Sequence, residues 1–254
     1  MKTERIIILT TGLAFLAALA CLWRSMPPAK ARIGEPRVVT SSTGKKISIR
    51  RSDDEGSNKD DRSFRESDGD EFTGVVRRDA KTSIVDAPIE SFDSVRELLM
   101  SLEPDEVIRS NPLISRASDN PRLSEEKRNV RVRAFLFAAK KSDDNDYHVM
   151  IADNDEQPTP DMTMTVEVSG LPEGGPDRDR LVAARDSFES YMNSLDSYEV
   201  SGTSYDFYSS IPVWVEGSLF FDVQHSSGDV GPIGYRSATV WEIHPVTSIE
   251  FIDP

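Results

Sequence analysis

The order of strand-like and helix-like segments after Asn129 is the feature that most constrains the fold of this chain. Five stretches of strand length, alternating in polarity or rich in β-branched and aromatic residues, lie at 130–141, 147–153, 163–170, 211–225 and 238–254. Between the third and the fourth stretch, residues 177–195 place apolar side chains at helical spacing. The sequence therefore predicts a mainly β domain with one long helix after its third strand.

Three strands, a helix and two further strands is the element order of the OB-fold, a small five-stranded Greek-key barrel. The resemblance covers about residues 128–252 and implies a mainly β fold with α, in which the helix joins strands 3 and 4. The stretches DNDYHVMI and WEIHPVT also resemble an uncharacterised group of bacterial exported proteins, which brings no established activity. An OB-like architecture does not imply a function, because unrelated sites are built on it.

The chain before this domain differs in composition and in the spacing of its apolar residues. Residues 25–91 are rich in Ser, Asp, Arg, Lys and Gly and show almost no apolar periodicity, which predicts a disordered tether. Residues 92–128 carry apolar residues at helical spacing after Asp93, a candidate helix cap. Because a segment of that size has too little core to fold alone, we expect a helical collar packed on the β domain at 129–254.

Residues 1–24 are built like an export signal or a membrane anchor. A short basic start precedes an apolar run over 6–17, and Ala18-Leu19-Ala20 matches a small-x-small cleavage pattern. Three alternatives follow: simple cleavage, lipidation of Cys21 at ALAC, which resembles a lipoprotein lipobox, or an uncleaved anchor over 6–23. Each alternative predicts that the rest of the chain is extracytoplasmic, in the periplasm or at the cell surface. With a single cysteine, no internal disulfide can form.

Charge is distributed unevenly along the chain. Residues 1–129 contain equal numbers of basic and acidic residues, so residues 130–254 carry the whole net charge of −14. Binding of duplex nucleic acid depends on neutralising phosphates with Lys and Arg, so nucleic acid is not an expected partner of the β domain. A soluble, well-hydrated surface is the simplest reason for so much acid.

All three histidines lie in the β domain, each close to a carboxylate. In a strand, residues two apart share a face, so Asp146 faces the same way as His148, and Glu242 the same way as His244. Asp222 precedes His225 by three residues, at the end of the fourth strand. The candidate ligand-binding residues are therefore His148, His225, His244, Glu242, Asp146 and Asp222.

Imidazole and carboxylate groups from neighbouring strands suit two kinds of chemistry. They can coordinate a divalent ion such as zinc, for which His148, His225 and His244 are the candidate ligands, or act as a general acid/base pair. The spacing matches no compact metal motif such as H-E-x-x-H, and no G-x-S-x-G nucleophile elbow is present. A hydrogen-bonded polar network that fixes the barrel is the interpretation the sequence favours. No cofactor is expected, a divalent metal being the alternative.

The sequence thus predicts an extracytoplasmic, non-enzymatic OB-like module that binds a protein or small-molecule ligand or has a structural role. Its N-terminal segment would hold it at the membrane or be removed to release it. The alternative is a metal-dependent hydrolase that uses the His/carboxylate residues of the barrel.

Overall fold

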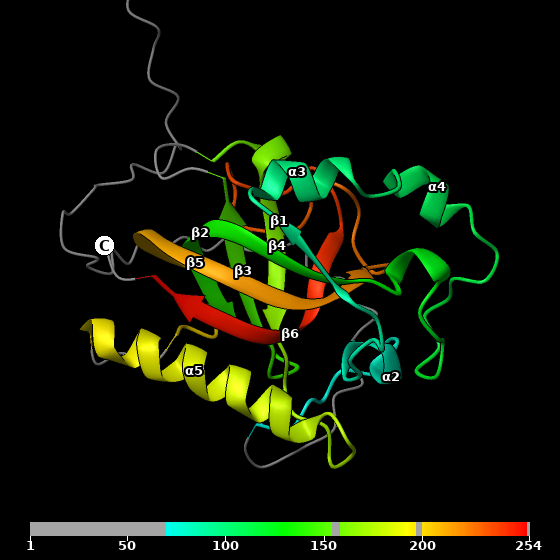
Figure 1. Ribbon diagram of the computed structural model, residues 1–254, viewed down its shortest axis with the longest axis horizontal. Coiled ribbons are helices and arrows are strands. Elements are labelled where there is room, and N and C mark those ends of the chain that lie inside the picture. The colour runs from blue at the N-terminus through cyan, green and yellow to red at the C-terminus, as the bar shows by residue number, and fades with distance from the viewer. Residues whose placement is uncertain (1–69, 154–157, 197–199, 253–254) are drawn as a thin grey trace, which may run out of the picture. The chain divides into compact units, whose positions relative to one another are not determined.

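The computed structural model describes residues 70–153, 158–196 and 200–252, which form mainly a β-sheet with a few helices (Figure 1). The strands are β1 (Ile89–Phe92), β2 (Asn129–Lys141), β3 (Tyr147–Ala152), β4 (Thr163–Val168), β5 (Asp206–Phe221) and β6 (Trp241–Phe251). The helices are α2 (Arg78–Lys81), α3 (Val95–Met100), α4 (Asp105–Arg109) and α5 (Arg178–Asp196), with 3₁₀ turns η1 (Ser124–Glu126) and η2 (Pro160–Met162). The predicted order of three strands, a helix and two strands is confirmed by β2, β3, β4, α5, β5 and β6.

The strands follow the order β1-β2-β3-β4-β6-β5, and β5 also pairs with β2. The five strands from β2 to β6 therefore pair in a closed ring, while β1 adds in parallel to β2. Within the ring, β4 and β6 pair in parallel and the other neighbours are antiparallel. Strand β5 begins at Asp206, before the predicted start at residue 211, because Asp206 and Phe207 pair with Ala139 and Ala138 of β2.

Alternate positions of the ring strands supply the main apolar core. Its strand members include Val132, Leu136, Val149, Ile151, Met164, Val166, Val213, Val215, Leu219, Trp241, Ile243 and Ile249. Helix α5 adds Phe188 and Met192 to this core, and Tyr191 stacks on Phe251 with ring centroids 3.6 Å apart. Because strand side chains alternate between two faces, the intervening residues of β3, β4 and β6 point away from this core.

Strands β5 and β6 leave regular pairing around Gly217. The register shifts on both sides of this glycine, which faces Val246. A Cβ at Gly217 would collide with the carbonyl oxygen of Pro245 and the side chain of Ile243, so a side chain there would push the two strands apart. At this irregularity the His244-Pro245 peptide bond is cis.

Residues 70–91 do not belong to a tether, and the prediction for the end of segment 25–91 is wrong. Phe72 and Arg77 are fully buried, α2 follows, and β1 joins the sheet. The Arg77 guanidinium makes two 2.7 Å hydrogen bonds to the Glu126 carboxylate. Partners so distant in sequence leave no periodic signal. The remainder of the predicted tether, the export segment 1–24 and Cys21 lie outside the described residues.

The segment predicted as a collar contains the short elements α3, α4 and η1. Ser94, not Asp93, caps α3, since its hydroxyl accepts a hydrogen bond from the Glu97 N–H. Val95, Leu98 and Ile108 of this segment belong to the main core cluster. In the part of the chain that the structure describes, no helix is both long enough and apolar enough to cross a membrane.

Candidate functional site

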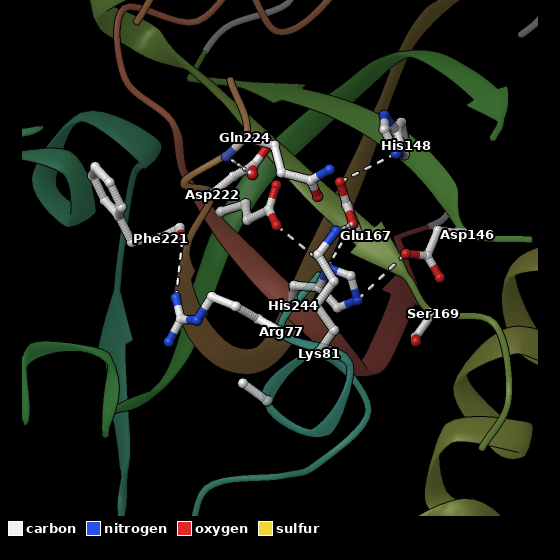
Figure 2. Close-up of polar contacts among 12 residues, drawn as sticks. Arg77, Lys81, Asp146, His148, Glu167, Ser169, Phe221, Asp222, Gln224 and His244 are labelled. Atoms are coloured by element: carbon white, nitrogen blue, oxygen red, sulfur yellow. Dashed lines mark hydrogen bonds and ion pairs between the residues drawn. The ribbon is translucent and has the colours of Figure 1, made fainter. Parts of the chain in front are cut away.

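The candidate site lies on the face of β3, β4 and β6 that points away from the apolar core (Figure 2). His148 comes from β3, Glu167 from β4, and Glu242 and His244 from β6. All four side chains are buried, although this face is polar. Aromatic rings enclose it: Phe72 lies edge-on to the His244 ring at 6.4 Å between centroids, and Phe220 packs against the same ring at 5.6 Å.

Glu167 is the centre of this polar group. It pairs with His148 across the β3–β4 ladder, and its Oε1 lies 3.2 Å from His148 Nε2. Its Oε2 lies 2.5 Å from His244 Nδ1 and 3.7 Å from Lys81 Nζ. Burial alone would raise the pKa of Glu167, but His148, Lys81 and His244 together lower this pKa well below its usual value. Glu167 is therefore a buried carboxylate held ionised by its neighbours.

Two other carboxyl groups of the cluster behave in the opposite way. Burial, then the charge of Glu167, raises the pKa of Glu242 well above its usual value. Burial and the charges of Asp144 and Glu167 likewise raise the pKa of Asp146. Like charges in a dry site repel one another, so the pKa values of Glu242 and Asp146 move up while that of Glu167 moves down.

Of the pairs that the sequence predicted, Glu242 and His244 meet here, and Asp146 meets His244 from the other pair. His244 Nδ1 lies 3.3 Å from Glu242 Oε1, and His244 Nε2 lies 3.5 Å from Asp146 Oδ2. Asp146 Oδ1 accepts a 2.5 Å hydrogen bond from the Gly170 N–H. Burial lowers the pKa of His244, which keeps its imidazole neutral at neutral pH. Among the described residues, neither Asp146 Oδ2 nor His244 Nε2 has a hydrogen-bond partner.

Lys81, at the end of α2, brings the positive charge to the cluster (Figure 2). Burial would lower its pKa, but the surrounding carboxylates, Glu167 first, raise this pKa well above its usual value. Its Nζ also lies 5.6 Å from the centroid of the Phe220 ring. Lys81 is therefore a buried ammonium group that closes the polar face from the side of residues 70–86.

Arg122 supports this face through the backbone. Its guanidinium donates a 2.7 Å hydrogen bond to the carbonyl oxygen of His244 and a 2.5 Å bond to that of Ala80. Burial lowers the pKa of Arg122 to about 10, which still leaves the group charged at neutral pH. Arg122 thus links β6 to residues 70–86, the segment that covers the polar face and is called the cover below.

His225 and Asp222 form a separate pair. Their side chains are joined through His225 Nδ1 and Asp222 Oδ2, and the imidazole lowers the pKa of Asp222 against the effect of burial. The described residues that can jointly hold a metal ion are Asp146, Glu167 and His244, whose ligand atoms all lie within 4.8 Å of one another. This set contains one of the three histidines predicted as metal ligands, and His148 reaches it through Glu167.

Two central residues were not among the sequence candidates. Glu167 could have been found, because in TMTVEVSG it alternates with Met164, Val166 and Val168 and so lies on their opposite face. Lys81 carries no comparable signal, since it lies in a segment without periodicity. The assembled group can share protons among its carboxyls or hold one cation.

No known protein family, curated protein or solved structure matches this chain.

Proposed function

We propose that this chain is an extracytoplasmic, non-enzymatic module of OB-like architecture that has a binding or structural role. The export-type build of residues 1–24 supports this location, with the N-terminal segment either holding the module at the membrane or being removed. The stretches DNDYHVMI and WEIHPVT, which resemble bacterial exported proteins, favour the same compartment.

The OB-like assignment is supported by the ring of pairings β2-β3-β4-β6-β5 and by the position of α5 after the third ring strand. In OB-folds, the loops between strands 1 and 2 and between strands 4 and 5 flank the ligand-binding face. The corresponding loops of this chain are 142–146 and 222–240. A protein or small-molecule ligand is therefore expected beside these two loops.

The observation that carries the non-enzymatic proposal is the burial of the chemically useful groups. Asp146 and His244 are 0% exposed and Glu167 is 2% exposed. A catalytic base must come within hydrogen-bond reach of its substrate. Here Phe72 packs against His244 and Lys81 pairs with Glu167, so a substrate could not reach these groups. The main role of the cluster is therefore to stabilise the fold.

The absence of catalysis is tested on the full chain with chromogenic ester, phosphodiester and peptide substrates, with and without Zn²⁺ or Mn²⁺. The expected turnover equals that of a folded His244→Gln variant. Turnover that depends on the metal and is lost in this variant would overturn the proposal.

The binding face is tested by placing a photo-reactive amino acid at Ile233, which is 42% exposed in the β5–β6 loop. The matched control is the same probe at Met100, which is 80% exposed at the end of α3. In a bacterial cell envelope, a discrete adduct is expected from Ile233 alone. Equal adducts from both positions, or none from either, would remove the loop face as a binding surface.

The second candidate is a metal-dependent hydrolase, favoured by the convergence of Asp146, Glu167 and His244. The sequence predicted His148, His225 and His244 as the metal ligands of such a hydrolase. With the His225 imidazole bonded to Asp222, a hydrolase would have to use the Glu167-centred group, and its substrate could enter only after the cover moved away. Activity that increases when Phe72 is replaced by Ala in a folded variant would favour this candidate.

A further inference from the structure

We propose that Asp146, Glu167 and His244 form a binding site for one divalent transition-metal ion of the zinc class, for which the Lys81 ammonium is a built-in competitor. The site would hold the ion within the fold and requires no substrate. It is therefore independent of the ligand-binding role proposed for the loop face.

The donor set fits such an ion in chemistry and in spacing. Zinc takes imidazole nitrogen and carboxylate oxygen ligands at about 2.0–2.2 Å. Asp146, Glu167 and His244 each present one such atom, and all three atoms lie within 4.8 Å of one another. Asp146 immediately precedes β3, whereas Glu167 lies in β4 and His244 in β6, so the sheet and the Gly170 N–H hold the three side chains together.

Two of these donors face each other without a hydrogen bond between them. His244 Nδ1 lies against the carboxylates of Glu167 and Glu242, so the neutral ring directs its lone pair on Nε2 toward Asp146. Asp146 Oδ1 is taken by the Gly170 N–H, which leaves Oδ2 as the atom facing that lone pair. Both atoms are buried and lack a hydrogen-bond partner among the described residues.

The distance between these two atoms points to an ion more than to a direct bond. They are 3.5 Å apart, whereas a hydrogen bond from a carboxyl O–H is usually below about 3.0 Å. Two ligands of a tetrahedral zinc ion are about 3.3 Å apart, from bond lengths near 2.0–2.1 Å. The Glu242 carboxyl, 3.3 Å from Nδ1, would orient the imidazole, as carboxylates commonly do for metal-binding histidines, while Glu167 Oε2 would leave Nδ1 to bind the ion.

Lys81 is the group that a metal ion would have to displace. Its Nζ lies 3.7 Å from Glu167 Oε2, where it neutralises the carboxylate that would complete the donor set. Lys81 ends a helix of a single turn, and its Nζ lies 5.6 Å from the centroid of the Phe220 ring. Removing the ammonium while keeping an apolar side chain of similar length should therefore strengthen metal binding.

The test uses the full chain, stripped of metal with a chelator and titrated with Zn²⁺ against a chromophoric zinc indicator. One equivalent is expected to bind. Asp146→Asn and His244→Gln should each weaken binding at least about tenfold, and Lys81→Met should strengthen it at least about tenfold. The matched controls are Glu250→Gln and Lys141→Met, which alter a carboxylate and a lysine outside the cluster and should leave the affinity unchanged.

Lys81→Met keeps all three donors, so it remains informative if the donor variants unfold. Its thermal midpoint should rise with Zn²⁺ concentration more steeply than that of the wild type, because an ion that binds the folded state stabilises it. The proposal is overturned if neither the wild type nor Lys81→Met binds Zn²⁺. It is equally overturned if Asp146→Asn and His244→Gln fold and bind Zn²⁺ as the wild type does. Equal affinity of Lys81→Met and the wild type would refute the competition.

Discussion

The two faces of β3, β4 and β6 are both buried, yet they are built from opposite chemistry. One face carries Val149, Val166 and Ile243 into the main core. The other face is formed by the neighbouring residues of the same strands and carries His148 and Glu167 beside Glu242 and His244. The comparison shows that polarity along a strand does not decide which face meets water.

The two faces are stabilised by different physics. Burial of the apolar face gains free energy roughly in proportion to area, and this gain does not depend on direction. The polar face is stable only where each charge meets a partner, because an uncompensated buried charge costs several kcal/mol. Lys81 supplies such a partner to Glu167 and Arg77 supplies one to Glu126, so these buried charges should be the more sensitive to single substitutions.

The largest effect is expected from Arg77→Met. This substitution leaves the Glu126 carboxylate buried without its 2.7 Å partner, which should lower the free energy of unfolding by about 3–5 kcal/mol. Denaturant unfolding followed by tryptophan fluorescence measures the change. The control is Arg128→Met, whose pair with Glu90 is partly exposed and should contribute at most about 1 kcal/mol. Similar losses in both variants would contradict the distinction between buried and exposed pairs.

A smaller or similar loss is expected from Ile243→Ala on the apolar face. Truncating this fully buried side chain removes apolar contacts and leaves a cavity, which should lower the free energy of unfolding by about 2–5 kcal/mol. The same unfolding measurement applies. A loss below about 1 kcal/mol would mean that the core relaxes around the cavity, and that the apolar face is more adaptable than its packing indicates.

The smallest effect at acidic pH is expected from Glu242→Gln. Because the folded-state pKa of Glu242 is raised, this group is protonated in the folded protein and glutamine resembles it closely. At pH 4 the wild type and the variant should therefore differ by less than about 1 kcal/mol.

Above the ordinary glutamate pKa, the same variant should become progressively more stable than the wild type. The unfolded wild type then ionises Glu242 while the folded protein does not, so rising pH favours unfolding until the folded pKa is reached. The difference in free energy of unfolding should grow by up to about 1.4 kcal/mol per pH unit. Denaturant unfolding at a series of pH values measures this slope, and a difference that stays constant with pH would show that Glu242 is ionised in the fold.

Periodicity was sufficient to predict the ring strands, helix α5 and the shared faces of Glu242 with His244 and of Asp146 with His148. These features depend on residues that are close in sequence. The burial of the polar face could not be predicted in the same way, because it depends on Phe72, Arg77 and Lys81 from a segment without periodicity. A prediction of disorder from composition depends on the number of apolar residues. This segment is instead held mainly by Arg77 and Lys81, which pair with the buried carboxylates of Glu126 and Glu167, so its composition was misleading.

The cover over the polar face also has a consequence for how the chain is made. Residues 70–86 leave the ribosome before any strand of the ring, while Lys81 pairs with Glu167 and Arg77 bonds to the carbonyl oxygen of Phe221. At synthesis rates of about 5–20 residues per second, Arg77 and Lys81 are made on the order of ten seconds before the residues they pair with. During that interval residues 70–86, which carry three basic and four acidic side chains, are a water-exposed peptide open to chaperones and proteases.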